Sequence, residues 1–243
     1  MQGQPPHPTE RTRRTRRPGG IPVRLCGHRQ SGGRRMTPTA TAPAPTTPAP
    51  APTGPDRGLA AEAAGWGPMP TPAGEFRLRP VRLPDDLPLL TRWMNDPAVD
   101  AWWELAGPPA TTEAHLRAQL DGDGRSAPCL GLLDGTPMSY WEVYRADLDP
   151  LAAHYPSRPG DTGLHLLIGP AHRRGRGLGS PLIAALTERI LARRPACPRV
   201  LAEPDLRNTP SVRAFLRAGY TRAAVLDLPA KRAALMIRRR DAR

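Results

Sequence analysis

The sequence predicts a domain of the α/β or α+β class, in which helices pack on a mixed β-sheet. Residues 76–83 alternate between apolar and polar side chains, as a half-buried strand does. Two further strands meet at Asp134-Gly135, a pair that is typical of a hairpin turn. In the second half of the chain a strand, a helix and another strand follow one another. Such a crossover implies that these two strands lie parallel.

The first half of the predicted domain combines helices with the antiparallel hairpin. Residues 84–96 begin with proline and two acids, which is common at the start of a helix. A short helix is expected near 111–124, with Thr111 or Thr112 as its N-cap. The hairpin strands are expected at 127–135 and 137–146.

The second half contains longer apolar segments. Residues 161–169 are mostly apolar, as expected for a strand that is buried on both faces. Residues 178–194 carry apolar side chains at helical spacing and therefore predict a helix. The remaining elements are a strand at 199–205, a helix at 209–219 that ends at Gly219, and closing strands at 220–228 and 233–240.

The chain divides into two parts of different composition. Residues 1–74 are rich in Arg, Pro, Ala and Thr and hold few large apolar side chains, so they cannot bury enough surface to offset the entropy lost on folding. We therefore expect a disordered basic arm at 1–74 and one folded domain at 75–243, which is long enough for a single core. An alternative is that the true start lies downstream, at Met36 or Met69.

The net charge of +13 is unevenly distributed. Ten arginines against Glu10 and Asp56 give residues 1–57 a charge of +8, so the predicted domain is only mildly basic. A basic arm can bind polyanions without a dedicated site. No aromatic residues alternate with these arginines to stack bases, and we expect no specific nucleic-acid partner.

The cysteines and the apolar runs limit the classes of protein further. Cys26, Cys129 and Cys197 lie far apart and lack CxxC spacing, which predicts neither a disulfide framework nor a metal site. No apolar run approaches the roughly 18 residues that a membrane span needs. We expect a reduced, cytoplasmic protein with no membrane partner.

The segment "HRRGRGLG", residues 172–179, joins the apolar strand to the following helix. Glycine permits unusual backbone angles, and the first turn of a helix presents unpaired N–H groups at the positive end of its dipole. Arg174, Arg176 and Arg173 would add positive charge at the rim, which suits a pyrophosphate. The spacing matches neither GxxxxGK[ST] nor GxGxxG, so a P-loop and a Rossmann site are disfavoured.

Several motifs resemble those of a known family. Arg174, Gly177 and Gly179 fit the pattern [QR]xxGx[GA] of the acyl-CoA loop in GCN5-related N-acetyltransferases. Together with "GLHLLIGP" and "PDLRN", residues 76–239 resemble the siderophore branch of that superfamily. This branch comprises hydroxylamine acyltransferases similar to the aerobactin, desferrioxamine and mycobactin enzymes.

The resemblance implies a fold and a cofactor site. The fold is a mixed, mostly antiparallel sheet with flanking helices, whose fourth and fifth strands splay apart around the pantetheine of acetyl-CoA or succinyl-CoA. The amine attacks the thioester directly, so neither a Ser or Cys nucleophile nor a metal is required. The implied cofactor-binding residues are Leu167, Ile168, Arg173, Arg174, Gly175, Arg176, Gly177, Leu178, Gly179 and Asn208.

His165 and Asp205 are the candidate catalytic residues. Each alone could be structural, His165 as a core histidine and Asp205 as a helix cap. The resemblance instead implies a substrate-contacting histidine and a proton-accepting aspartate, whose side chains could converge where the strands separate. Which of the two accepts the proton stays open. Asn208 is either a contact to pantetheine or another helix cap.

Four further residues are candidates for binding the acceptor, besides His165. Trp102 and Trp103 could line a pocket that is apolar between polar ends, although one of them is expected in the core. Glu142 and Tyr144 lie on alternate positions of one predicted strand and could also contact the acceptor.

The implied function is an acyl-CoA-dependent N-acyltransferase that makes a hydroxamate from N-hydroxycadaverine, N-hydroxylysine or N-hydroxyornithine, in siderophore biosynthesis. One alternative is acetylation of ordinary amines such as aminoglycosides, which an acidic acceptor pocket would favour. Another is a non-catalytic protein that binds acyl-CoA, or polyanions through its arm. The acyl group, and the choice between monomer and homodimer, stay open.

Overall fold

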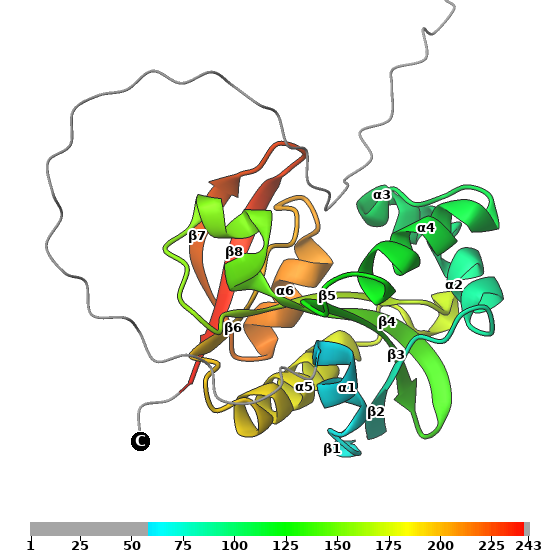
Figure 1. Cartoon of the computed structure of the whole chain (residues 1–243), viewed down its shortest axis with the longest axis horizontal. Helices are drawn as coiled ribbons and strands as arrows, with labels where there is room; N and C mark the ends of the chain where they lie inside the picture. Colours follow the sequence, from blue (N-terminus) through cyan, green and yellow to red (C-terminus); the bar gives the residue numbers. More distant parts are fainter. Residues whose placement is uncertain (1–57, 241–243) are drawn as a thin grey trace, which may run out of the picture. The chain divides into compact units, whose positions relative to one another are not determined.

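A computed structural model describes residues 58–240 (Figure 1), where helices pack on both faces of a single β-sheet. The predicted arm up to residue 57 lies outside the described residues. The strands are β1 (Met69–Thr71), β2 (Gly74–Pro80), β3 (Ser126–Leu133), β4 (Thr136–Arg145), β5 (Thr162–Ile168), β6 (Arg199–Ala202), β7 (Thr221–Asp227) and β8 (Arg232–Arg239). The α-helices are α1 (Leu59–Ala64), α2 (Leu87–Met94), α3 (Pro97–Trp103), α4 (Pro109–Leu120), α5 (Gly179–Arg193) and α6 (Thr209–Arg217). The 3₁₀ turns are η1 (Ala146–Leu148), η2 (Pro150–His154) and η3 (Ala171–Arg173).

The strand order is β1-β2-β3-β4-β5-β6-β8-β7, and every neighbouring pair is antiparallel except β5 and β6. The predicted fold class and the parallel pair across the crossover helix α5 are thus confirmed. β5 and β6 pair only at Thr162 with Val200 and at Gly163 with Leu201. The two strands therefore part after Gly163, and the remainder of β5 has no β6 partner.

The hairpin between β3 and β4 has the predicted turn. Asp134 and Gly135 both adopt left-handed backbone angles, with φ of 49° and 76°. Two consecutive residues with positive φ form the mirror-image turn whose twist matches that of the strands on either side. The hairpin places Tyr140, Glu142 and Tyr144 on one face of β4, since alternate residues of a strand share a face.

The two faces of the sheet carry different helices. On one face α1, α5 and α6 pack over apolar side chains that include Trp141 and Leu164. On the other face α2, α3 and α4 pack over Leu130, Tyr140 and Leu167. None of the helices within residues 58–240 has the length and apolar content that crossing a bilayer requires.

The structure corrects the predicted start of the folded part. α1 and β1 lie inside the segment that the sequence predicts to be disordered up to residue 74. Leu59, Ala63, Trp66 and Met69 are buried in the core, so a few well-spaced apolar side chains suffice to order this short segment. The folded domain therefore begins by residue 58 and not at residue 75.

The predicted cap of the helix near 111–124 is also wrong. α4 begins at Pro109, whose ring fixes the backbone angle that a first helical position needs, and Pro108 occupies the cap position. Thr112 lies inside the helix and is fully buried. The preceding α3, which the sequence analysis did not assign, begins at Pro97, and its N-cap is Asp96, whose side chain accepts a hydrogen bond from the backbone N–H of Ala98.

Candidate active site

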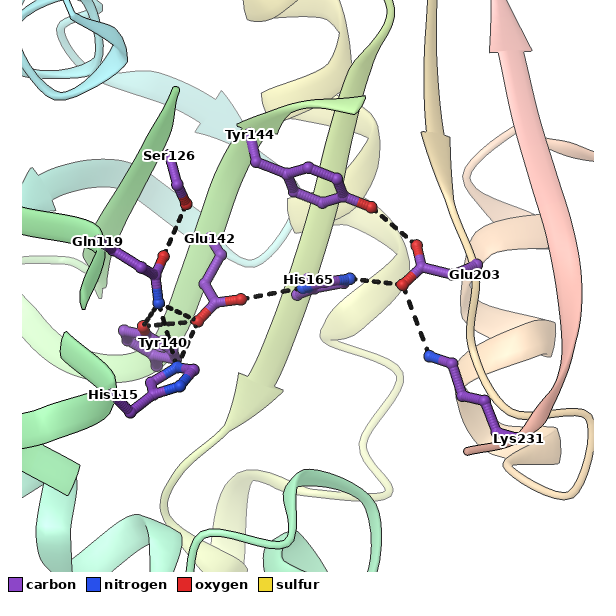
Figure 2. A network of polar contacts seen from close by, with 9 residues as sticks. All are labelled: His115, Gln119, Ser126, Tyr140, Glu142, Tyr144, His165, Glu203 and Lys231. Atoms are coloured by element: carbon purple, nitrogen blue, oxygen red, sulfur yellow. Dashed lines mark hydrogen bonds and ion pairs between the residues drawn. The ribbon is translucent and has the colours of Figure 1, made fainter. Parts of the chain in front are cut away.

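The imidazole of His165 spans the gap where β5 and β6 part (Figure 2). His165 Nδ1 lies 2.9 Å from Glu142 Oε2, and His165 Nε2 lies 2.6 Å from Glu203 Oε1. Glu142 is the register partner of His165 on β4, and Glu203 directly follows the last residue of β6. One side chain thus links the two strands that backbone pairing no longer joins.

The geometry fixes the charge of His165. Both ring nitrogens face carboxylate oxygens, which only accept hydrogen bonds when ionised, so both nitrogens carry protons. Burial opposes the charged form, but the carboxylates of Glu203 and Glu142 outweigh it and raise the pKa of His165 to about 10. His165 is therefore an imidazolium at neutral pH and has no lone pair with which to accept a proton.

A cluster of polar groups holds Glu142 from the α4 side. Its Oε1 lies 2.7 Å from Nε2 of both His115 and Gln119, and it accepts a hydrogen bond of 2.9 Å from the Tyr140 hydroxyl. His115 and Gln119 reach the same atom because residues four apart lie on one face of a helix. Burial alone would raise the pKa of Glu142, but hydrogen bonds from His115 and His165 hold it well below its usual range.

Glu203 is held on the opposite side of His165. Its Oε2 accepts a hydrogen bond of 2.8 Å from the Tyr144 hydroxyl, and its Oε1 lies 3.5 Å from Nζ of Lys231, the only lysine of the chain. Burial raises the pKa of Glu203, but the nearby charge of His165 overrides this and keeps it below its usual range. We call His115, Gln119, Tyr140, Glu142, Tyr144, His165, Glu203 and Lys231 the His165 network.

Aromatic rings enclose the imidazole. Trp103 stands edge-on to His165 with ring centroids 6.3 Å apart and makes similar contacts with Tyr140 and His115. Tyr144 lies 4.8 Å from His165, centroid to centroid. Trp102 is exposed. Of the two predicted tryptophans, Trp103 therefore packs on the His165 network and Trp102 lies at the surface.

The carboxylate that contacts His165 from the β6 side belongs to Glu203, and Asp205 makes no direct contact with His165 among the described residues. Within residues 58–240 Asp205 binds Arg207 instead, through the Arg207 backbone N–H at 2.8 Å and its Nη2 at 2.8 Å. The hydrogen bond from Arg207 lowers the pKa of Asp205. The Arg207 side chain is 78% exposed, so it is free to swing away from this carboxylate.

The predicted glycine loop has the backbone that an anion site needs. Gly175 and Gly177 have φ of 71° and 77°, and no described atom lies within 4 Å of where a side chain would begin at either position. α5 starts at Gly179 without a side-chain cap, so its first N–H groups are available to a ligand. Arg176 is exposed beside them, and Arg173 is half-buried.

The structure places the other expected cofactor residues as follows. Leu167 and Ile168 lie on the part of β5 beyond the last pair with β6, so one backbone edge there is without a strand partner among the described residues. The Oδ1 atom of Asn208 accepts a hydrogen bond from the Ser211 backbone N–H, so Asn208 caps α6. The guanidinium of Arg174 is paired with Asp96, the N-cap of α3, so its charge is already matched within the described chain.

Sequence reasoning missed five members of the His165 network, namely His115, Gln119, Tyr140, Glu203 and Lys231. Two signals were present in the sequence. Polar residues four apart in 115–119 share a helix face, and Tyr140 shares a strand face with Glu142. Nothing local identifies Glu203 or Lys231, which reach the network through the splay of β6 and the turn before β8.

Comparisons with known proteins identify the family of this chain. The sequence profile of the acetyltransferase (GNAT) domain matches residues 82–228. Lysine N-acyltransferase MbtK of Mycobacterium sp. (strain MCS) is 34% identical over 168 residues, covering 69% of this chain and 68% of that protein. N(6)-hydroxylysine O-acetyltransferase of Escherichia coli is 34% identical over 152 residues, covering 63% and 48%. AAC(6')-Ib, in its structure with ribostamycin and coenzyme A, is 26% identical to this chain in sequence. The match has a TM-score of 0.60 and covers 68% of this chain and 93% of that one.

Proposed function

This chain belongs to the GNAT acetyltransferase family, and we propose that it forms a hydroxamate from an N-hydroxylated amine and acyl-CoA in siderophore biosynthesis. As a member of the family it is an N-acyltransferase. The names of two relatives contain N(6)-hydroxylysine and N-hydroxyputrescine and support an N-hydroxylated amine as the acceptor, while the name lysine N-acyltransferase supports an acceptor of the lysine type. In the reaction a C–N bond forms at the thioester carbon and the C–S bond breaks. The proton lost by nitrogen balances the thiolate that leaves.

The acyl-CoA would lie along the open edge of β5 and the glycine loop. The backbone N–H groups at Gly175–Gly179 and the charges of Arg173 and Arg176 would hold the pyrophosphate. The backbone edge of Leu167 and Ile168 that faces away from β4 would pair with the pantetheine, and the Nδ2 amide of Asn208 would lie beside it. Open space beyond the two left-handed glycines supports this assignment, since nothing from the described chain fills it.

A hydroxylamine acceptor is supported by one observation, the low proton affinity of the carboxylates around the gap between β5 and β6. The carboxylates of Glu142, Glu203 and Asp205 all have lowered pKa values, and His165 is already protonated. An alkylammonium, with a pKa near 10.4, would not give up a proton to such weak bases. A hydroxylamine is neutral near pH 7, so it needs a proton acceptor only as the C–N bond forms.

Asp205 would be that acceptor, and His165 would not. Both oxygens of Glu203 are occupied within the network, whereas among residues 58–240 Oδ2 of Asp205 is held by the Arg207 side chain, which is exposed and can move away while the Arg207 backbone N–H stays on Oδ1. His165 would orient the acceptor between Trp103 and Tyr144 while its charge stays fixed by the two glutamates.

The same geometry disfavours an aminoglycoside as the acceptor. A polycationic drug needs free carboxylates to bind its ammonium groups. Glu142 and Glu203 are the buried carboxylates nearest the gap, and His115, His165 and Lys231 already hold them. Unpaired acidic charge of that kind is therefore absent from the His165 network.

The test measures CoA release from acetyl-CoA and succinyl-CoA with two hydroxylamines, N-hydroxycadaverine and N6-hydroxylysine. Cadaverine, lysine and kanamycin serve as comparison amines, and ferric ion reveals the hydroxamate by colour. We expect turnover only with hydroxylamines and a loss of kcat/KM of about a hundredfold or more in Asp205→Asn. Asp227→Asn is the matched control, because Asp227 also pairs with an exposed arginine but lies on the closing hairpin.

Turnover on the plain amines alone would make the protein an ordinary amine acetyltransferase. CoA binding without any turnover would make it an acyl-CoA-binding protein. An unchanged kcat/KM in Asp205→Asn would remove Asp205 from the mechanism.

A further inference from the structure

Arg174 occupies the first position of the predicted acyl-CoA motif, yet its guanidinium points back into the protein. It pairs with both carboxylate oxygens of Asp96, with Nη1 3.0 Å from Oδ1, and Nη2 also donates to the carbonyl of Gly169 at 3.2 Å. Both side chains of the pair are half-buried. A bidentate, partly buried pair of this kind is among the stronger polar contacts in proteins.

Asp96 is at the same time the N-cap of α3. Its Oδ1 accepts a hydrogen bond of 2.9 Å from the backbone N–H of Ala98, with the extended backbone angles of a cap residue. The hydrogen bonds from Arg174 and from that N–H lower the pKa of Asp96, so the carboxylate is charged at neutral pH. One carboxylate therefore fixes both the first turn of α3 and the side chain of Arg174.

α3 leads directly to the His165 network. Its last residue is Trp103, whose ring stands edge-on to His165 and Tyr140. The neighbouring helix α2 is seated on the end of β5, since Trp93 packs so closely on Gly169 that a side chain there would overlap its ring. The base of the glycine loop, the start of α3 and the wall of the acceptor site thus form one continuous set of contacts.

We propose that Arg174 is a positioning residue for the acceptor side of the reaction, acting through Asp96 and α3 on Trp103, rather than a ligand of the CoA pyrophosphate. The inference rests on the proposed acyl transfer, because it concerns the site at which the acceptor meets His165. The positive charge that binds the phosphate would then come from Arg176, which is exposed in the same loop and makes no ion pair with any residue from 58 to 240.

The experiment is a double-mutant cycle on Arg174→Gln and Asp96→Asn. Asparagine caps a helix about as well as aspartate, so Asp96→Asn weakens the ion pair while it keeps the start of α3. We expect each single variant to raise the KM for the acceptor about tenfold, which is the size expected for losing a charged hydrogen-bonded contact. The double variant should be little worse than either single one, because both remove the same contact.

Binding of CoA supplies the second readout. Calorimetric titration should give a Kd for CoA within about twofold of the wild type in Arg174→Gln and in Asp96→Asn. The matched control Arg176→Gln removes the same charge from the same loop and should weaken CoA binding severalfold while leaving the KM for the acceptor unchanged. Thermal unfolding of every variant shows whether it is folded.

Two results would overturn the inference. One is a Kd for CoA that rises in Arg174→Gln but not in Asp96→Asn, which would make Arg174 a phosphate ligand. The other is additive effects of the two substitutions on the acceptor KM. Any acceptor that turns over can be used, so an enzyme that acts on plain amines would refute the proposed function and still test this inference.

Discussion

The His165 network and the glycine loop both belong to β5 and its continuation, yet they are built in opposite ways. In the network each charge meets an opposite charge of the same chain, and His165 bridges two buried carboxylates. In the loop the left-handed glycines and the uncapped start of α5 leave backbone N–H groups and an exposed arginine facing outward. The polar groups of the network are paired within the protein, whereas the N–H groups and the arginine of the loop are open to a ligand.

Because of this difference, substitutions in the network should mainly affect folding stability, and substitutions in the loop should mainly affect ligand binding. Removing one member of a closed buried network leaves its partners unpaired, which costs folding free energy. Removing a feature of the open loop leaves nothing unpaired in the free protein, so its effect should appear mainly in ligand affinity. Substitutions in the two regions therefore provide a direct test of the comparison.

The largest expected effect comes from Glu142→Leu, which keeps most of the side-chain volume but removes the carboxylate. His165, His115 and Gln119 each lose a hydrogen-bond partner, and the half-buried imidazolium is left beside one acid instead of two. We expect a loss of about 3–5 kcal/mol in the free energy of unfolding, as for other broken buried ion pairs. Urea denaturation at neutral pH measures this change.

Glu75→Leu is the control for that substitution. Glu75 pairs with Arg77 on the exposed side of β2, and such surface pairs contribute about 0–1 kcal/mol. If both substitutions cost the same, Glu142 is not held in a buried network and the comparison between the two regions fails.

The next effect is a dependence of stability on pH that His165 dominates. Its pKa is raised from 6.5 to about 10 in the folded protein, so the stability it contributes is complete below pH 6.5 and is lost as the pH rises towards about 10. Glu142 and Glu203 act in the other direction. Their pKa values are lowered from 4.5, so their contribution is present above that pH and is lost on acidification.

Urea denaturation between these limits checks both signs. Stability should be highest between pH 4.5 and 6.5 and should fall on the alkaline side in the wild type. In His165→Gln the alkaline decline should become much smaller, because the imidazole whose pKa folding raises to about 10 is then absent. An unchanged alkaline slope in this variant would show that another group carries it.

The sequence predicts the open loop better than the closed network, and the reason is physical. A glycine loop between a strand and a helix is a local pattern, visible in the order of residues 161–194. Whether Glu203 or Asp205 faces His165 depends instead on where β6 ends and how far it diverges from β5. That angle is set by packing between distant segments, which no local pattern encodes.

The same limit applies to the partner of Arg174 and to the start of the domain. The motif shows that Arg174 is charged, but its partner Asp96 lies on a helix far away in sequence. α1 and β1 are short segments that owe their order to the core beneath them, and a composition rich in Pro and Ala hides them. Long elements with a clear period, such as α5 and β4, are predicted close to their observed bounds.

The smallest effect on stability is expected in the loop, where Gly177→Ala and Gly179→Ala form a matched pair. Gly177 has a φ of 77°, an angle that costs an L-residue about 1–2 kcal/mol, although open space surrounds it. Gly179 is the first residue of α5, does not have a positive φ, and a methyl group there would make an ordinary contact with Ala214 at 3.5 Å.

We therefore expect Gly177→Ala to lose about 1 kcal/mol of stability and to weaken CoA binding about tenfold, because the strained loop relaxes and its N–H groups turn away from the phosphate. Gly179→Ala should leave both quantities nearly unchanged, since alanine favours the helix. Thermal unfolding and calorimetric titration with CoA measure the two effects. Equal losses of affinity in both variants would mean that the phosphate approaches the start of α5 so closely that any side chain there excludes it. The positive φ of Gly177 would then not be the property on which CoA binding depends.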